Sequence, residues 1–278
     1  LSILNLVSNS TGRIISGSII FNGEDLLKKT KREMYSIRGK KISMIFQDPM
    51  TSLNPVITVG NQIEEVIKLH NKCSSAEATQ KAVAIFEKVG ITAERFSEYP
   101  HQFSGGMKQR VIIAIALACN PQLIIADEPT TALDVTIQAQ ILDMMKKLKE
   151  DLNTSMLLIT HDLGVVAEIC DRVAIMYAGE IVECGSKRDI FKCAAHPYTR
   201  GLFDSLPSLT NDVDRLKPIP GLMPDPMNLG PYCSFSSRCS LASNKCFKED
   251  PKLIHLDNEH YVKCFKYYNA KEASECTQ

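Results

Sequence analysis

Apolar residues recur between positions 17 and 184 with two different periods, which together predict alternating strands and helices. Short apolar runs that end in polar residues are typical of buried strands, and apolar residues spaced three to four apart are typical of helices covering a sheet. The predicted strands are residues 17–22, 41–46, 123–126, 156–160, 173–177 and 180–184, and the predicted helices are residues 28–38, 58–90, 104–119, 135–151 and 163–170. This alternation predicts an α/β fold with a mainly parallel sheet between helices.

Two stretches depart from the alternation and predict separate parts of the chain. The stretch from about residue 58 to residue 105 reads as helical, which predicts a helical subdomain inserted into the α/β domain. After about residue 209 a proline-rich segment begins, and the chain beyond it shows little periodicity. We therefore expect an α/β domain over residues 1–208 and a small C-terminal extension over residues 209–278.

The composition is that of an ordinary globular protein without a dominant charge. The sequence has 278 residues, of which 44% are hydrophobic, and its 32 basic residues equal its 32 acidic residues. A net charge of zero argues against a nucleic-acid-binding protein with a dominant basic field. No apolar run approaches the roughly 18 residues that a membrane-spanning helix needs. The first residues do not have the pattern of a signal peptide.

The strongest candidate for chemistry is the pair Asp127–Glu128, which directly follows the apolar run Leu123–Ala126. Open α/β sheets bind ligands at the carboxyl ends of their strands, which is where this pair is expected. We expect Asp127 to hold a Mg²⁺ ion through water and Glu128 to act as general base toward an attacking water. Pro129 disfavours a continuing helix and keeps both acids at the end of the strand.

Two further predicted strands also end in polar side chains, those of Gln47 and His161. His161 is expected to donate a hydrogen bond to a terminal phosphate and to position the water. Gln47 offers a neutral oxygen to Mg²⁺ and an amide to the water. Taken alone, each would more simply be a polar residue at a loop, and only the neighbouring carboxylates favour the functional interpretation.

A third feature is the tripeptide Ser104-Gly105-Gly106, where a predicted helix begins. Serine is a favourable helix N-cap, and glycines let phosphate oxygens approach the backbone N–H groups at the positive end of the helix dipole. Alone, the tripeptide would more simply be a capped helix after a glycine turn. Its position shortly before the carboxylate strand favours phosphate binding.

These elements follow one another in an order that resembles the ATP-binding subunits of ATP-binding cassette (ABC) transporters. The matching motifs are IFQD around Gln47, SGGMKQR from Ser104, LIIADE up to Glu128, TALD up to Asp134 and ITHD around His161, within roughly residues 11–206. The resemblance implies a RecA-like P-loop NTPase core with an antiparallel β part. It also implies ATP and Mg²⁺ as ligands, and ATP hydrolysis coupled to transport.

A narrower set of motifs resembles the oligopeptide/dipeptide importer ATPases. These motifs are IFQDPMTSLNPVITVGNQI, FSGGMKQRVIIAIAL, HPYTRGL and a tail with LKPIPG followed by Cys-x5-Cys. The subgroup also includes nickel and glutathione importers, which the motifs do not separate. The resemblance implies a peripheral subunit at the cytoplasmic face of the bacterial inner membrane. Its partners would be membrane-spanning permease subunits, contacted by the helical subdomain, and indirectly a substrate-binding protein.

In this family two ATPase subunits pair head to tail and sandwich ATP between motifs of both. The residues implied to bind nucleotide are Gln47, Ser104, Gly105, Gly106, Gln109, Asp127 and Asp134. The stretch Ser104–Gln109 would serve a nucleotide held mainly by the partner, and Asp134 would lie at the dimer seam. Whether the dimer is formed by identical or by homologous subunits stays open.

One departure from the family concerns the phosphate-binding loop G-x-x-x-x-G-K-[ST]. The sequence contains no such motif, because Gly39-Lys40-Lys41 lacks the first glycine and the hydroxyl and precedes a strand. We expect the chain to be a fragment of a longer protein, and we expect the chain by itself to bind ATP poorly. The alternative is a regulatory subunit that does not hydrolyse ATP at its own site.

Four of the ten cysteines cluster in the C-terminal extension, with the spacing C-x5-C-x6-C-x17-C. They are Cys233, Cys239, Cys246 and Cys264. Four thiols in a short segment suit an iron–sulfur cluster such as [4Fe–4S], or Zn²⁺. The absence of a C-x2-C pair disfavours zinc, and unlinked thiols are the remaining alternative. The resemblance favours the cluster, with a structural or regulatory role.

A competing class of function is a soluble ABC ATPase that acts on DNA or ribosomes. Such a protein would call for a second cassette, a coiled-coil insertion or basic arms, and the sequence contains none of these. We therefore predict an energy-coupling ATPase of a peptide importer.

Overall fold

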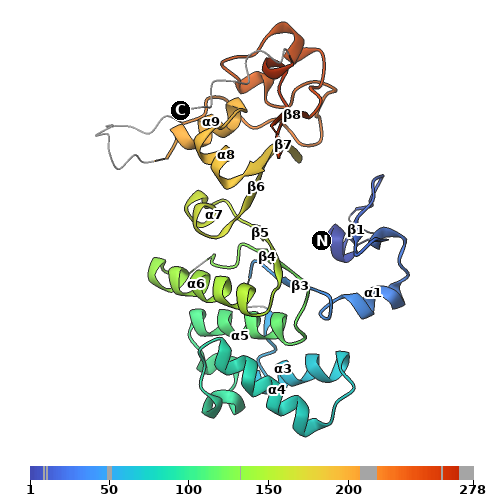
Figure 1. The fold of residues 1–278 in the computed structure, drawn as a ribbon, viewed down its shortest axis with the longest axis vertical. Helices are drawn as coiled ribbons and strands as arrows, with labels where there is room; N and C mark the ends of the chain where they lie inside the picture. The colour runs from blue at the N-terminus through green and yellow to red at the C-terminus, as the bar shows by residue number, and fades with distance from the viewer. Residues whose placement is uncertain are drawn as a thin grey trace. The chain divides into compact units, whose positions relative to one another are not determined.

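The computed structural model describes residues 1–8, 10, 12–48, 52–131, 133–206, 218–257 and 259–268. The chain divides into two compact units, Leu1–Leu163 and Gly164–Gln278, and each is described by itself (Figure 1). The boundary lies earlier in the chain than the expected start of the C-terminal extension at residue 209. Every residue predicted to bind nucleotide or Mg²⁺ belongs to the first unit, and the four clustered cysteines belong to the second.

The centre of the first unit is a parallel sheet with the strand order β3-β4-β5. Its strands are β3 (Ile42–Ile45), β4 (Leu123–Asp127) and β5 (Ser155–Ile159). The register pairs Ile45 with Ala126 and Asp127 with Ile159. All three strands therefore end at one edge of the sheet, as the sequence predicts. The residues that directly follow the three strands are thereby brought close together.

Two helices of this unit begin next to predicted site residues. They are α5 (Gly105–Leu117) and α6 (Val135–Asp151). Each begins where an oxygen accepts a backbone N–H: Ser104 Oγ accepts from Met107, and Asp134 Oδ1 accepts from Ile137. Helix α5 contacts β3, α6 and the helices α3 and α4, so apolar residues line most of its circumference. Within the described residues, no helix is both long and apolar enough to cross a membrane.

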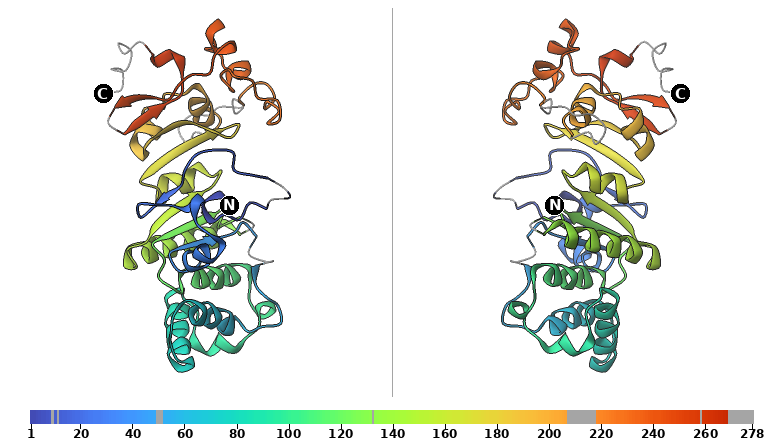
Figure 2. Two further views of the ribbon diagram at one scale, coloured as in Figure 1. Left: turned by 90° about the vertical axis from the view of Figure 1, so that its right-hand side faces the viewer. Right: turned by 90° about the vertical axis from the view of Figure 1, so that its left-hand side faces the viewer.

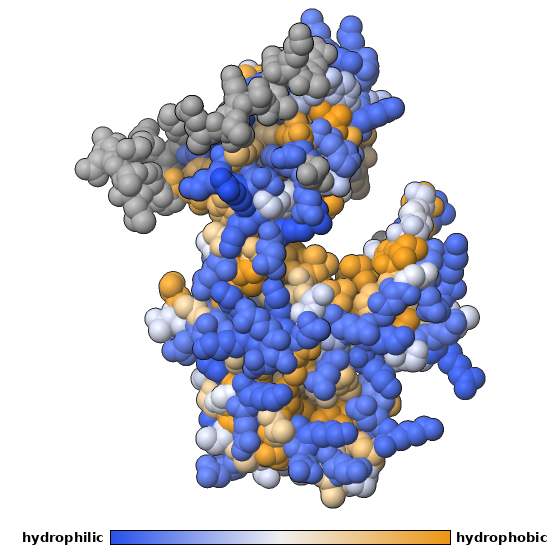
Figure 3. Space-filling model, viewed as in Figure 1, coloured by the Kyte–Doolittle hydropathy of each residue, from blue (hydrophilic) through white to orange (hydrophobic). Residues whose placement is uncertain are grey.

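The stretch predicted as a helical subdomain is helical, but it is built from shorter elements than expected. They are α3 (Val59–His70), α4 (Ser75–Lys88) and the 3-10 turns η3 (Ala93–Ser97) and η4 (Pro100–Gln102). A capping box between Ser74 and Glu77 starts a new helix, which divides the stretch that the periodicity predicted as one. Figures 1 and 2 show α3, α4 and α5 next to one another at one end of the unit. Over this region Figure 3 shows apolar atoms at the surface between hydrophilic ones.

The N-terminal part of the first unit shares a small hydrophobic core with β3 and β4. Its elements are η1 (Ser2–Leu4), β1 (Ile20–Phe21), β2 (Glu24–Asp25), η2 (Leu26–Lys28) and α1 (Lys31–Ile37). Strand β1 is much shorter than the predicted strand 17–22, because Asn22 and Gly23 turn the chain into a hairpin with positive φ at both residues. Helix α1 begins only at Lys31, because Thr30 caps it.

The second unit contains an antiparallel sheet with the order β6-β7-β9-β8. Its elements are α7 (Leu163–Ile169, which starts at the boundary), β6 (Arg172–Tyr177), β7 (Glu180–Ser186), α8 (Lys187–Lys192), α9 (Pro197–Asp204), η5 (Ser236–Arg238), η6 (Asn244–Phe247), β8 (Ile254–Asp257), β9 (His260–Val262) and η7 (Phe265–Tyr267). The expected mainly parallel sheet therefore holds for β3 to β5 only. Strand β6 is antiparallel to β7, because Ala178 and Gly179 form a hairpin turn with positive φ.

The C-terminal extension continues the sheet of the second unit. Strand β9 pairs with β7, with Glu183 opposite Val262 and Cys184 opposite Tyr261. The sequence analysis found little periodicity in this part of the chain and missed both β8 and β9. Both strands are short, and the β8–β9 pairing is irregular between His255 and Asp257. Strands of four and three residues are too short for their alternation to stand out in the sequence.

Candidate active site

The carboxylate of Glu128 is the meeting point of side chains that follow three neighbouring strands. Gln47 Nε2 donates to Oε2 of Glu128 at 3.0 Å, and His161 Nδ1 lies 2.9 Å from Oε1. Thr131 Oγ1 also donates to Oε2, at 2.9 Å. The structure thus brings together three residues that the sequence predicted as one site.

These contacts set the charge of the carboxyl group. The hydrogen bond from His161 lowers the pKa of Glu128 most, followed by the hydrogen bond from Thr131 and more weakly by that from Gln47. A donor to a carboxylate stabilises its ionised form. Glu128 is therefore held as an anion, which is the form that a general base requires.

The backbone at Glu128 has an unusual conformation. Its φ angle is 45°, in the left-handed region that residues other than glycine seldom occupy. The N–H of Glu128 donates to Ile159 O at 2.9 Å, and Thr131 N donates to Glu128 O at 3.1 Å. Strain of this kind persists only where the surroundings hold it in place.

Asp127, the last residue of β4, is half-buried at the same edge of the sheet. Its side chain makes none of the hydrogen bonds or ion pairs found among the described residues. A carboxylate without such hydrogen bonds at the edge of the sheet where Gln47 also lies suits a Mg²⁺ ion that keeps several of its waters. The residues present therefore fit the predicted ion.

The turn Ser104-Gly105-Gly106 forms the exposed start of helix α5 and lies on different elements from the Glu128 cluster. A Cβ atom at Gly106 would lie 2.5 Å from Cγ2 of Ile137, so only glycine fits where α5 and α6 meet. At Gly105 the nearest atom, in Leu133, would be 3.8 Å away. Close packing of α5 against α6 thus requires glycine at position 106. At position 105, glycine leaves the backbone open toward solvent.

The remaining two predicted residues differ in burial. Asp134 is exposed and caps α6. Gln109 is only 1% exposed, and its Nε2 donates to the carbonyl of Pro129 at 2.5 Å. The predicted contact of Gln109 with nucleotide stays a prediction, but its amide is aimed into the protein.

The sequence analysis did not identify Thr131 as a site residue. A hydroxyl three positions after the expected base, in Glu128-Pro129-Thr130-Thr131, is the signal that could have indicated it. Its contact depends on the turn at Glu128, and the hydrophobic pattern does not predict that turn.

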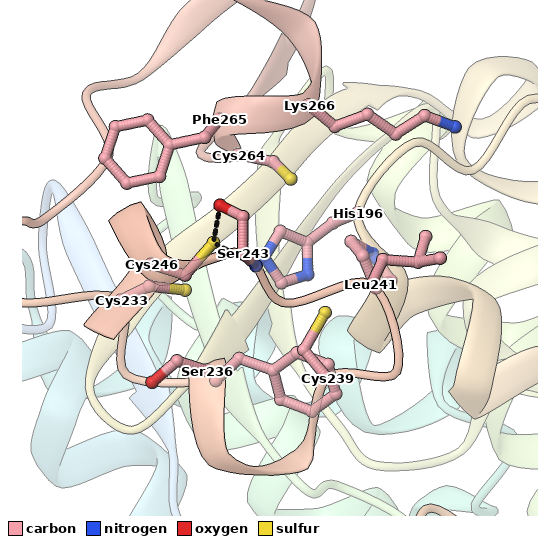
Figure 4. Close-up of a pocket in the computed structure, with 12 residues that line it drawn as sticks. His196, Cys233, Ser236, Cys239, Leu241, Ser243, Cys246, Cys264, Phe265 and Lys266 are labelled. Carbon is pink, nitrogen blue, oxygen red and sulfur yellow. Dashed lines mark hydrogen bonds between the residues drawn. The ribbon is translucent and has the colours of Figure 1, made fainter. Parts of the chain in front are cut away.

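The four clustered cysteines of the second unit line one cavity of about 400 Å³ (Figure 4). They come from separate segments: Cys239 follows η5, Cys246 lies in η6 and Cys264 precedes η7. Burial raises the pKa of Cys233 to about 11 and also raises the pKa values of Cys239 and Cys264. The raised pKa values keep Cys233, Cys239 and Cys264 protonated at neutral pH.

The spacing of the four thiols bears on what they can hold. A tetrahedral Zn²⁺ keeps its thiolates roughly 4 Å apart, since each Zn–S bond is about 2.3 Å. Among the described residues, no group of three or more His, Cys, Asp or Glu side chains lies close enough to hold a single metal ion. The described side chains therefore form no metal site as they stand, and the [4Fe–4S] cluster stays a prediction.

A buried polar network lies next to the cavity and was not predicted. Glu183 is fully buried and accepts hydrogen bonds from the backbone N–H groups of Ala195 and His196 at 2.7 and 2.9 Å. Its Oε1 also lies 2.8 Å from Nε2 of His260 on β9. His196 lines the cavity, and its Nδ1 accepts from the N–H of Tyr198. Burial lowers the pKa of His196 to about 4.

Comparison with known proteins gives two family matches and many similar chains. Residues 2–131 match the family model "ABC transporter", and residues 182–246 match "Oligopeptide/dipeptide transporter, C-terminal region". The oligopeptide transport ATP-binding protein AppD of Bacillus subtilis is 52% identical over 269 residues, or 96% of this chain and 82% of AppD. The oligopeptide transport ATP-binding protein OppD of the same organism is 51% identical, over 94% of this chain and 74% of OppD.

Solved structures of ABC cassettes have a similar fold. The dimeric structure of the ATP-binding cassette MJ0796 bound to ADP and Pi is 29% identical, with a TM-score of 0.56 over 63% of this chain and 75% of that chain. The cbiO1 structure from Clostridium perfringens, part of the ABC transporter complex cbiONQ, is 25% identical, with a TM-score of 0.58 over 64% of this chain and 68% of that chain.

The fold and the site thus define an ABC ATPase, a class of enzyme that couples ATP hydrolysis to transport. Within that class, the chain belongs to the ATP-binding subunits of the oligopeptide/dipeptide importer family. The predicted fold class and the predicted family are both confirmed.

Proposed function

We propose that this chain belongs to the ATP-hydrolysing subunit that powers the import of oligopeptides or dipeptides through a membrane transporter. The observation that carries the proposal is the Glu128 carboxylate, held by Gln47 and His161 where three parallel strands end. An ionised carboxylate at such an edge can accept a proton from a water that attacks a phosphoryl group. The names of relatives such as AppD and OppD supply the cargo class.

The residues around Glu128 divide the remaining tasks. Asp127 and Gln47 would hold Mg²⁺, which neutralises charge on the phosphates when it is bound. His161 would position the terminal phosphate and the water. All of these side chains lie at or just after the ends of β3, β4 and β5. They can therefore act together at one edge of the sheet.

The start of α5 serves a different nucleotide in this proposal. Ser104, Gly105 and Gly106 present an exposed turn with free N–H groups at a helix N-terminus, which suits phosphate oxygens. We propose that a second ATPase subunit brings its nucleotide to this turn and that Asp134 lies at the seam between the subunits. The MJ0796 cassette, described as dimeric, supports such a pairing.

The other partners follow from the same proposal. Membrane-spanning permease subunits would contact the helical subdomain, and a substrate-binding protein would act through them. The chain would then lie at the cytoplasmic face of the membrane as a peripheral subunit.

The test uses the protein expressed from its complete reading frame, together with the permease and binding-protein subunits, in liposomes. We expect peptide-stimulated phosphate release and uptake of a labelled peptide, both abolished by Glu128→Gln. The matched control is Glu150→Gln, which removes an exposed carboxylate on α6. Uptake of nickel or glutathione without peptide uptake would overturn the cargo class. Assembly without hydrolysis would favour a regulatory subunit.

We further propose that Cys233, Cys239, Cys246 and Cys264 hold a [4Fe–4S] cluster with a structural or regulatory role. Support comes from the convergence of all four thiols on one cavity. The backbone N–H and the hydroxyl of Ser243 lie 3.5 and 3.4 Å from Sγ of Cys246, where they would stabilise a ligating sulfur.

Anaerobic purification followed by visible spectroscopy tests the cluster. We expect absorbance near 400 nm together with bound iron and sulfide, and we expect loss of both on Cys239→Ser. Cys184→Ser, which removes a half-buried thiol from β7, is the matched control. Colourless protein without iron would contradict the proposal, and stoichiometric zinc in its place would show that the four thiols hold a single ion instead of a cluster.

A further inference from the structure

The bond between Gln109 and Pro129 joins the two parts of the site that serve different nucleotides. Gln109 lies in the second turn of α5, the helix that begins at Ser104. Pro129 directly follows Glu128 and is itself buried. This hydrogen bond therefore links two regions. One is the Ser104–Gly106 turn, which is proposed to meet the partner's nucleotide, and the other is Glu128, which is proposed to act on the nucleotide of this chain.

The orientation of the amide is settled by its surroundings. Nε2 of Gln109 faces the Pro129 carbonyl at 2.5 Å, and the opposite orientation would place two oxygens against each other. The other end of the amide, Oε1, is buried without a hydrogen-bond partner among the described residues. A buried amide that leaves one end unsatisfied is an expensive way to fill space, and a methionine of similar volume would fill it better. The single bond is the feature that requires a glutamine here.

A hydrogen bond to the carbonyl oxygen of Pro129 can affect the conformation of the turn at Glu128. Its peptide unit is adjacent to Glu128, whose φ of 45° has to be maintained by its neighbours. The Glu128 N–H and C=O are each fixed by a backbone bond. The amide of Gln109 adds a third fixed point, on the side of the turn that faces α5.

The two helices next to this turn, α5 and α6, are packed tightly against each other. Gly106 lies so close to Ile137 that no Cβ atom fits between α5 and α6. Asp134 begins α6 only five residues after Pro129. A shift of α5 along its axis would therefore displace both the Glu128 turn and the start of α6.

We propose that Gln109 is a positioning residue, which fixes the Glu128 turn relative to helix α5. Because α5 begins at the Ser104–Gly106 turn, catalysis at Glu128 then depends on what binds at that turn. The inference rests on the proposed ATP hydrolysis. It changes the role expected for Gln109 from contact with the nucleotide to alignment of the base.

The test compares Gln109→Met with a matched variant in the protein expressed from its complete reading frame and assembled with its transporter partners. Thr154→Val is the control: Thr154 Oγ1 is buried and donates to the carbonyl of Pro121 at 2.9 Å, before the other ends of β4 and β5. Both changes delete one buried bond from a side chain to a proline carbonyl and nearly conserve volume. Only the first touches the catalytic turn.

We expect Gln109→Met to lower kcat about tenfold while KM for ATP changes less than twofold, as is typical of a misaligned catalytic group. Thr154→Val should leave both constants within twofold of wild type. In a Glu128→Gln background, Gln109→Met should cause no further loss, because the base it aligns is already gone. Thermal unfolding of each variant reports whether the fold is intact.

The outcomes separate this inference from the proposed function. Wild-type kcat in Gln109→Met, an equal loss in Thr154→Val, or a further tenfold loss in the Glu128→Gln background would overturn the positioning role. Hydrolysis in the wild type that Glu128→Gln abolishes would at the same time leave the proposed function standing. A wild-type complex that does not hydrolyse ATP would overturn both.

Discussion

Nδ1 of His161 lies 2.9 Å from Oε1 of Glu128, across 33 positions of the chain. Because an ionised carboxylate only accepts hydrogen bonds, Nδ1 must carry the proton. A neutral imidazole then has no second N–H, and its Nε2 is an acceptor. His161 can therefore donate to a phosphate through Nε2 only as an imidazolium, or through Nδ1 after it releases Glu128. The predicted phosphate contact therefore requires a change at His161 from the arrangement in this structure.

Replacing Glu128 by glutamine removes the base but keeps a side chain of the same shape. We expect the ATPase rate of the assembled transporter to fall by about 10²–10⁴-fold, the usual contribution of a general base. ATP binding should persist, because Gln47, Asp127 and the backbone are unchanged. Phosphate release and nucleotide retention, measured on the same samples, check both parts, and retained hydrolysis would remove Glu128 from the role of base.

The hydroxyl of Thr131 should affect the pH dependence of hydrolysis. Its hydrogen bond lowers the pKa of Glu128, and the base acts only when ionised, so activity is lost as the pH falls through that pKa. Thr131→Val raises the pKa and should move the acidic limb of the pH–rate profile to higher pH. Thr130→Val, next in the chain and without a hydrogen bond to Glu128, is the matched control. Superimposable acidic limbs for the two variants would contradict the assignment.

The polar ends of the strands could be predicted because they depend on few physical facts. Gln47, Glu128 and His161 each follow an apolar run, and parallel strands end at one edge. Thr131 and Gln109 could not be assigned their contacts in this way. The hydrogen-bond partner of Thr131 depends on the left-handed φ at Glu128, and that of Gln109 depends on which side of α5 faces the buried turn. The spacing of apolar residues predicts neither of these features.

The second unit shows the limits of pattern reading in a different way. The spacing of four cysteines indicated a common site, but a spacing does not say how far apart the thiols lie. Only the fold shows that Cys233 and Cys264, which are 31 positions apart in the chain, line one cavity. The strand β9 was likewise missed, although it carries His260 to the buried Glu183.

The two glycines at the start of α5 should differ in what an added methyl group does. Gly106→Ala places Cβ against Ile137 and should destabilise the fold by about 1–3 kcal/mol through overpacking. Gly105→Ala meets nothing closer than 3.8 Å, so it should not destabilise the fold, since alanine is the better helix former. Urea unfolding of the two variants checks the difference.

Although Gly105→Ala should not destabilise the fold, we expect it to reduce ATPase activity. The methyl group of Gly105→Ala would occupy the exposed side of the turn, where phosphate oxygens have to approach the backbone. We expect this variant to fold as well as wild type and yet to lose most ATPase activity in the assembled transporter. Full activity in Gly105→Ala would show that the turn does not receive a nucleotide.

The buried imidazole of His196 should make the stability of the chain depend on pH above the range in which carboxyl groups titrate. Burial lowers its pKa from 6.5 to about 4, so the unfolded chain binds a proton that the folded chain does not bind between these values. Stability is then lost as the pH falls from 6.5 toward 4, by about 2 kcal/mol between pH 7 and pH 5. The lowered pKa of Glu183 acts in the same direction, but only below its unfolded value of 4.5.

Asparagine at position 196 isolates this titration, because its side chain can still cap α9 as His196 does through Nδ1. His196→Asn should lower stability at both pH values but should reduce the difference between pH 7 and pH 5 by most of the about 2 kcal/mol. His255→Asn makes the same chemical change at an exposed position of β8 and should keep the wild-type difference. Urea unfolding followed by circular dichroism at the two pH values gives both comparisons. An equal pH dependence in wild type and His196→Asn would mean that the imidazole gains a proton without leaving its buried position.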